Sequence, residues 1–306
     1  MTTHDSGAGL PGMFFWVRAM LVLLYVGVPV LLVGTTVWWA ARSARLDVPA
    51  GLVRRARVAR LAGLAAGLLL GVLATRLGQV QLAPAAVAVG YLFGLLVAEL
   101  LVVPQPAGPL RVAALETRYV RRYIPRWSVP VLFFAGVLAV AVPIVLAVLP
   151  AVRYGPWHPD ALDAPQVILP GGTLQWPAAA CVPPAVLAVL ALFVGAIALR
   201  RVVLLPPVAV DRPGVDEHAR RNIARAVIAA VLAIELFVLA AQATLASNGV
   251  SVPGPVGGGP YLISRILVWC GFSLPIAGVL VWCVLGWWKR LVVEPPAAAP
   301  AGPAAV

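Results

Sequence analysis

The sequence predicts an all-α integral membrane protein, built as a bundle of about seven transmembrane helices. Of its 306 residues, 62% are hydrophobic and only 11% are charged, whereas about 25% of the residues in an ordinary soluble domain are charged. Seven separate stretches contain the roughly 20 mostly apolar residues that a helix needs to cross a bilayer. The basic residues gather in alternate connections between these stretches, which is typical of a chain that crosses a membrane repeatedly.

The seven apolar stretches define one membrane domain, at 19–290, and no soluble domain. The expected spans are 19–41, 59–78, 82–103, 128–150, 174–199, 223–246 and 262–288. The second span is the shortest and contains Arg76 near its end, so six helices with a re-entrant second segment remain an alternative. Residues 1–18 are expected to form a short extracytoplasmic segment, and the Pro/Ala-rich tail 291–306 a disordered cytoplasmic end.

The basic residues predict the orientation. With seven helices, 18 of them fall on one side and 4 on the other. Basic residues are retained in the cytoplasm, so we expect the N-terminus outside and the C-terminus inside. Arginine with abundant Ala, Val, Leu, Gly and Pro is typical of a GC-rich bacterial genome, so the bacterial plasma membrane is the expected location.

The segment "RYVRRYIPRW" at 118–127 is the most basic stretch of the chain, and "RRNIAR" at 220–225 echoes it. Written as a helix, 110–124 has arginines on one face and apolar residues on the other, as an interfacial helix on anionic lipid has. The expected contacts to lipid phosphate are Arg118, Arg121, Arg122, Arg126, Arg220 and Arg221. Nucleic acid is not expected as a partner, because no protruding module carries base-reading residues. The expected partners are anionic lipid headgroups and other membrane proteins. The echo fits either an old internal repeat or independent arginine clusters required by topology.

Small residues recur at every fourth position in the second and third spans. The two series are Ala59, Gly63, Gly67, Gly71 and Thr75, and Ala86, Gly90, Gly94 and Ala98. Small residues allow helix backbones to approach closely in lipid. The pattern predicts that these two helices pack as an antiparallel pair along the two series.

Prolines lie well inside four of the predicted helices. They are Pro29, Pro143, Pro183 with Pro184, and Pro275. Each removes a backbone hydrogen bond and kinks its helix. The kinks fit either hinges around a cavity or static bends.

Glu235 is the most informative single residue, because it falls near the middle of the sixth span. A carboxylate there costs roughly 2.5–3.5 kcal/mol on insertion scales, so it must face protein or water, or be protonated. Gln242, seven residues later, shares its helix face. One interpretation is a proton or ion site made by these two residues. The other is a neutral, structural Glu bonded to a hydroxyl or carbonyl, and the lack of a second acid at that depth favours it.

Glu99, one turn from the inner end of the third span, is expected to form an ion pair. The antiparallel packing of the second and third helices brings Arg60 to about its level, where a long arginine side chain reaches the carboxylate.

Enzymatic activity is not expected, and neither a cofactor nor a metal is predicted. Histidine occurs only at 4, 158 and 218, outside the apolar spans, and Cys181, Cys270 and Cys283 lie within them. The leading hypothesis is therefore a non-enzymatic accessory or structural membrane subunit. The alternative is a small secondary transporter or ion-coupled permease that uses Glu235, and the third is an integral-membrane enzyme.

Overall fold

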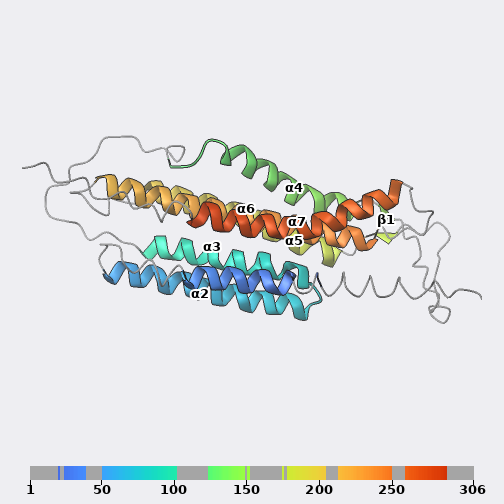
Figure 1. The fold of residues 1–306 in the computed structure, drawn as a ribbon, viewed down its shortest axis with the longest axis horizontal. Helices are drawn as coiled ribbons and strands as arrows, with labels where there is room; N and C mark the ends of the chain where they lie inside the picture. The colour runs from blue at the N-terminus through green and yellow to red at the C-terminus, as the bar shows by residue number, and fades with distance from the viewer. Residues whose placement is uncertain are drawn as a thin grey trace, which may run out of the picture.

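The protein is a bundle of long, nearly aligned helices (Figure 1). The computed structural model describes Met20 and residues 24–38, 50–101, 123–148, 150–151, 174–175, 178–204, 213–249 and 259–287, in places by backbone alone. A first helix covers Leu24–Trp38. The elements that follow are α2 (Ala50–Arg76), the 3-10 turn η2 (Val80–Leu82), α3 (Ala83–Leu101), α4 (Ser128–Val148), β1 (Pro150–Ala151), β2 (Leu174–Gln175), α5 (Ala178–Leu204), α6 (Pro213–Gly249) and α7 (Gly259–Trp287).

Six of these helices, α2 to α7, are long and apolar enough to cross a membrane, which suggests a multi-pass α-helical membrane protein. The helix Leu24–Trp38 is apolar but shorter, and the rest of the first expected span lies outside the described residues. Residues 59–76 of the second expected span lie within one uninterrupted helix, α2, and the last two residues of the span follow its end at Arg76. Its helical form gives no support to a re-entrant segment.

Two helices, α2 and α6, start nine and ten residues earlier than hydropathy predicts. Expected starts at 59 and 223 become Ala50 and Pro213 in the structure. The added turns contain arginine, alanine and other residues that favour the helix but not the lipid. Hydropathy detects only the apolar part of a helix, so α6 reaches 37 residues.

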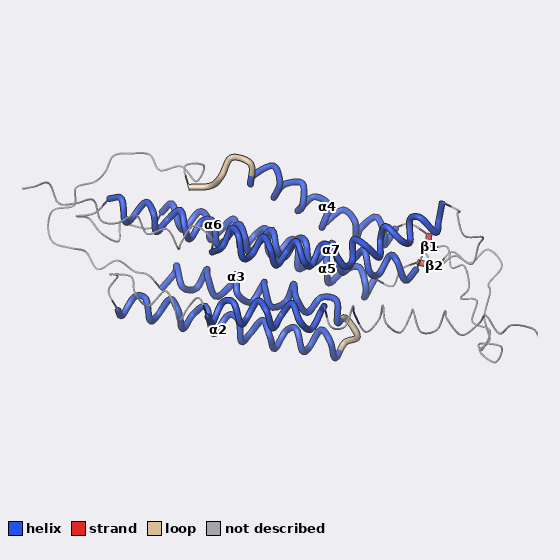
Figure 2. Tube along the Cα trace, in the orientation of Figure 1, coloured by secondary structure: helices blue, strands red, loops and turns tan. Residues whose placement is uncertain are grey.

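Two helices form the centre of the bundle. In both α3 and α6, 78% of the apolar window is buried, against 22–33% in the other four spanning helices. Figure 2 shows α2 and α3 on one side and α4, α5, α6 and α7 on the other. Contacts of α3 with α5 and α6 join the two groups, and α4, α5 and α7 also contact α6.

Glycines bring α2 and α3 into backbone contact. A Cβ added to Gly63 would lie 2.6 Å from Gly94 Cα, and one on Gly67 would lie 2.7 Å from Val87 O. A Cβ on Gly90 would meet Gly63 O and Gly67 Cα. Residue numbers increase along α2 in the direction in which they decrease along α3, so the two helices are antiparallel. A tight turn with Gly78 at φ 76° joins α2 to η2 and α3.

Glycines also set the position of α6 against its neighbours. A Cβ on Gly271 of α7 would lie 2.8 Å from Thr244 Oγ1, and one on Gly278 would lie 2.6 Å from Phe237 Cε1. On the other side, a Cβ on Gly195 of α5 would lie 2.5 Å from Val231 Cγ2. These contacts fix which residues of the three helices are level with each other.

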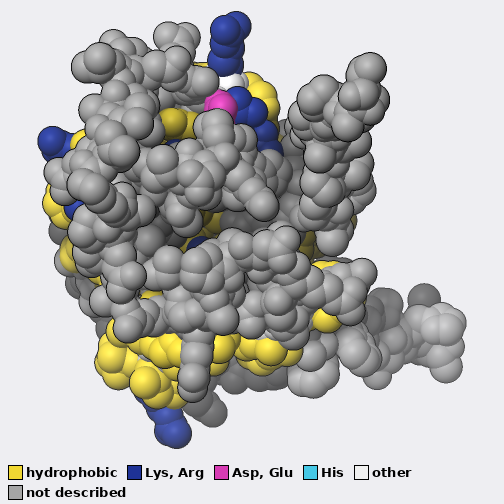
Figure 3. Space-filling model, turned by 90° about the vertical axis from the view of Figure 1, so that its left-hand side faces the viewer, with side chains coloured by type: hydrophobic (Ala, Val, Ile, Leu, Met, Phe, Trp, Pro, Cys, Tyr) yellow, Lys and Arg dark blue, Asp and Glu magenta, His cyan; other side chains and the backbone are white. Residues whose placement is uncertain are grey.

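Basic residues are unevenly distributed between the two ends of the bundle. The end where α2, α4 and α6 begin and α3 and α5 finish is called here the arginine-rich end. Its described arginine side chains are Arg60, Arg126, Arg200, Arg201, Arg220, Arg221 and Arg225, whereas Arg76 and Arg265 lie toward the other end. In the view of Figure 3, dark blue Lys and Arg side chains lie beside a small magenta acidic side chain near the top of the molecule.

We predict opposite effects for two glycine substitutions. Gly90→Ala places its methyl group against the α2 backbone and should destabilise the protein by about 1–3 kcal/mol. Gly34→Ala has open space within 4 Å of the new atom and should be neutral or stabilise the helix by up to about 1 kcal/mol. Thermal unfolding in detergent measures both. Equal midpoints for the two variants would contradict the proposed close contact of α2 and α3.

Candidate functional site

Glu235 and Gln242 are the two polar side chains buried deepest in α6. Both are 0% exposed. Within the described part of the chain, neither carboxylate oxygen of Glu235 and neither amide atom of Gln242 has a hydrogen-bond partner. Buried polar groups are nearly always hydrogen-bonded, and an exception calls for a physical explanation.

The two side chains lie on the face of α6 that contacts α5. Val231 on that face contacts Gly195 of α5. Glu235 and Gln242 follow Val231 by four and eleven residues, spacings that return to the same side of an α-helix. The sequence-predicted pair therefore shares a face, and that face points to a neighbouring helix.

The face of α5 that packs against Glu235 and Gln242 carries no polar side chain. It consists of small or cyclic residues, namely Pro184, Ala188, Ala191 and Gly195, all buried. Residue numbers in α5 and α6 run in opposite directions from the Gly195 contact, so Ala191 is level with Glu235 and Pro184 with Gln242. The interface thus pairs an acid and an amide with an apolar wall.

This arrangement favours the uncharged carboxyl group. An isolated carboxylate without a cation or hydrogen-bond donor is far costlier to bury than the protonated acid. Charge on Glu235 therefore requires that water, a cation or a donor reaches it.

The described residues show no metal centre around this acid. They contain no group of three or more His, Cys, Asp or Glu side chains that could hold a metal ion. Cys181, Cys270 and Cys283 are free thiols.

A second polar contact lies on the opposite side of α6. Thr244 Oγ1 donates to Ala240 O at 2.9 Å, so the Tyr25 hydroxyl donates to Thr244 Oγ1, also at 2.9 Å. Thr244 follows Gln242 by two residues, which turns its side chain by about 200° around the helix. This contact fastens the first helix to α6 and does not serve the Glu235 face. The sequence alone gave no indication that Tyr25 and Thr244 meet.

Trp282 of α7 is a further buried donor without a partner. It is 1% exposed, its Nε1 has no hydrogen-bond partner among the described residues, and its ring lies 4.6 Å from that of Tyr91 at 53°. It follows Gly278, which faces Phe237, by one turn. Phe237 and Glu235 point to opposite sides of α6, so Trp282 belongs to the α3–α6–α7 core and not to the Glu235 face.

The expected ion pair between Glu99 and Arg60 falls partly outside the described side chains. The backbone of Arg60 approaches α3, since a Cβ on Gly94 would lie 3.0 Å from Arg60 Cα. Glu99 is in the last turn of α3, but its side chain is not among those described. The pair stays a prediction.

Arg220 was expected to contact lipid phosphate, and the structure corrects this expectation. The residue is 2% exposed, and its Nη1 donates to Val202 O at 2.6 Å and to Val203 O at 3.5 Å. These carbonyls belong to the last turn of α5, which lacks intrahelical donors. A cation there also interacts favourably with the helix dipole. Arg220 therefore joins the end of α5 to the start of α6.

The other predicted lipid contacts differ in what the structure describes. Arg221 is exposed and its Nη2 lies 2.7 Å from Glu217 Oε1. Arg126 is exposed next to the start of α4, and Arg118, Arg121 and Arg122 lie outside the described residues, as does most of the expected interfacial helix. Tyr123 is buried in a small cluster with Val202 and Ala224. This cluster holds one residue from each of the two similar basic segments.

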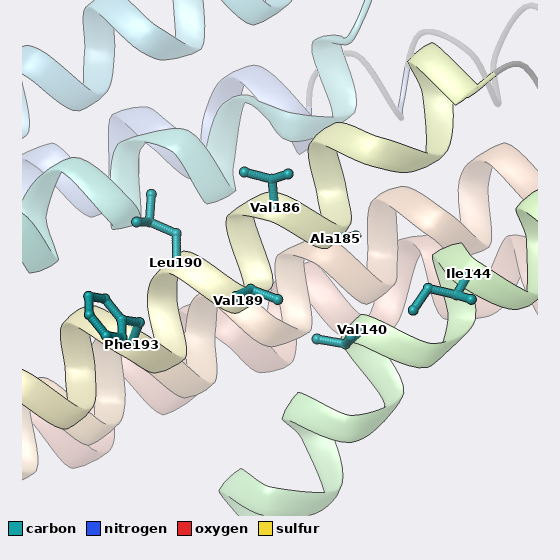
Figure 4. Close-up of a pocket in the computed structure, with 7 residues that line it drawn as sticks. All are labelled: Val140, Ile144, Ala185, Val186, Val189, Leu190 and Phe193. Atoms are coloured by element: carbon teal, nitrogen blue, oxygen red, sulfur yellow. The ribbon is translucent and has the colours of Figure 1, made fainter.

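An apolar groove of about 410 Å³ lies between α4 and α5. Figure 4 shows side chains from both helices around it. The lining residues are Val140, Ile144, Ala185, Val186, Val189, Leu190 and Phe193. None of them is polar, so the groove provides a surface for apolar groups and no group for catalysis.

No family model, no curated protein and no solved structure matches this chain.

Arg220 and Arg221 provide a matched pair for a stability test. Arg220→Leu removes the donor to the α5 carbonyls and should cost about 1–3 kcal/mol of unfolding free energy. Arg221→Leu removes an exposed pair and should cost no more than about 1 kcal/mol. Unfolding in an uncharged detergent measures both. A loss at Arg220 that appears only with anionic lipid would restore its role as a lipid anchor.

Proposed function

We propose that this is a multi-pass protein of the bacterial plasma membrane with seven transmembrane helices. Six helices of sufficient length and the apolar helix Leu24–Trp38 support this number. The concentration of arginine at one end of the bundle supports a cytoplasmic location for that end, with the N-terminus outside and the C-terminus inside.

We further propose that the protein is a small ion-coupled permease in which Glu235 exchanges the coupling proton. The observation that carries this proposal is the complete burial of Glu235 and Gln242 without partners on one face of α6. A purely structural acid would be expected to have a hydroxyl or carbonyl partner. Intramembrane carboxyl groups that face the bundle interior commonly belong to proton or ion pathways.

A non-enzymatic accessory or structural subunit is the second candidate. It is favoured by the close packing of α6, of which 78% of the apolar window is buried, and by small residues facing Glu235. Such packing suits a helix whose role is to hold others together. Proton movement through Glu235 separates the two candidates.

Replacing Glu235 should abolish proton movement. We expect proteoliposomes with the wild-type protein to take up protons under an imposed membrane potential, as reported by an internal pH-sensitive dye. Glu235→Gln keeps the shape of the side chain but has no titratable proton, so uptake should fall to that of protein-free vesicles.

Glu217→Gln is the matched control for this experiment. Glu217 lies on the same helix but is partly exposed and pairs with Arg221, so uptake should be unchanged. If the wild type moves no protons, or Glu235→Gln moves them normally, the permease proposal fails and the accessory role is preferred.

Cysteine labelling in intact cells tests the orientation. A membrane-impermeant thiol reagent should modify His158→Cys directly, and Arg118→Cys only after the membrane is permeabilised. The positions lie in connections at opposite membrane faces under the proposed topology. Modification of Arg118→Cys in intact cells would reverse the orientation.

A further inference from the structure

The internal prolines of α7 and of the first helix lie at one level of α6. Pro275 falls between Gly271 and Gly278, whose α6 partners are Thr244 and Phe237. Pro275 is therefore level with 240–241.

The first helix reaches the same level by an independent contact. Tyr25 bonds Thr244 near the end of α6. In the proposed seven-helix topology the first helix crosses the membrane in the direction opposite to α6. Pro29, one turn after Tyr25, is level with residue 240.

The internal prolines of α5 and α4 lie at the same depth along α6 as those of α7 and the first helix. The Gly195–Val231 contact makes Pro184 level with Gln242. A Cβ on Gly136 of α4 would lie 3.1 Å from Leu192 of α5, which makes Pro143 level with residue 185. Ile144, next to Pro143, and Ala185 both line the groove between α4 and α5.

The central helices have no such break. Neither α2 nor α6 nor α3 contains a proline beyond its first two residues. The bundle therefore combines an uninterrupted centre, α3 and α6, with four surrounding helices that all lack a backbone hydrogen bond near the depth of Gln242. Independent kinks would be expected at scattered depths.

We propose that these prolines form one hinge level, and that the segments beyond it swing away from α6 to open Gln242 to the membrane face opposite the arginine-rich end. The moving segments are the ends of the first helix, α4, α5 and α7 on that face. Helices bend most readily where proline removes the ladder hydrogen bond. Gln242 stands at the hinge level and Glu235 two turns below it, so water entering from that face reaches the amide first. This inference rests on the proposed function, whose coupling site it connects to one side of the membrane.

A buried cysteine at the hinge level tests the hinge. In full-length protein with its three native cysteines changed to alanine, Gln242→Cys is placed on the α5-facing side of α6, level with Pro184. Gln242 is 0% exposed in the closed structure. A membrane-impermeant thiol reagent added to oriented vesicles should modify it from the face opposite the arginine-rich end. Changing Pro183 and Pro184 to alanine, or separately Pro275, should slow modification about tenfold, because open conformers are minor states whose population the hinge sets.

Ala233→Cys is the matched control. Ala233 is also 0% exposed but lies on the side of α6 toward α7, so it should remain unmodified in every background. Modification of both cysteines would mean general loosening and would overturn the hinge, as would modification of Gln242→Cys from the arginine-rich side or at a rate insensitive to the prolines. An unchanged thermal midpoint shows that the proline variants are folded, and the Pro275 variant stands on its own if the double variant is not.

Proton uptake by vesicles with the cysteine-free protein, in which Gln242 is retained, distinguishes this inference from the proposed function. Proline-dependent labelling without Glu235-dependent uptake would keep the hinge and reject the permease. Glu235-dependent uptake without proline-dependent labelling would keep the permease and reject the hinge.

Discussion

Close backbone approach to α6 and α3 is the constraint on which the rest of the structure depends. Lipid is as apolar as leucine, so helices in a bilayer gain little by hiding apolar side chains from it and must associate through tight packing. Glycines at 63, 67, 90 and 94 bring α2 onto α3, and glycines at 195, 271 and 278 bring α5 and α7 onto α6. The same closeness leaves no neighbouring polar side chain for Glu235 and Gln242. Close packing of the helices therefore both stabilises the bundle and leaves Glu235 without a hydrogen-bond partner.

Periodic features of this fold were predictable from the sequence. The four-residue repeats of small residues indicated which faces of α2 and α3 pack together, because residues four positions apart lie on the same side of an α-helix. The seven-residue spacing of Glu235 and Gln242 likewise indicated that they share a side of α6. Burial of the acid also followed, since a carboxyl group in mid-membrane must turn inward.

The sequence did not predict which residues of another helix pack against a given helix face. Nothing in the chain indicates that Tyr25 meets Thr244, or that the Glu235 side faces alanines of α5. Arg220 shows the same difficulty, because a cluster of arginines next to an apolar span looks alike whether a member contacts lipid phosphate or the end of a helix. The depth shared by the four kinks also required the helix registers, which follow from contacts between residues far apart in the chain.

The length of α6 has a mechanical consequence. Its 37 residues extend about 55 Å at 1.5 Å per residue, nearly twice the roughly 30 Å of a hydrocarbon core. Its first turns, with the Glu217–Arg221 pair, must therefore project into water on the arginine-rich side. Because no proline interrupts α6 after its first residue, one continuous ladder of backbone hydrogen bonds runs from this projecting end to the turn that holds the buried Glu235.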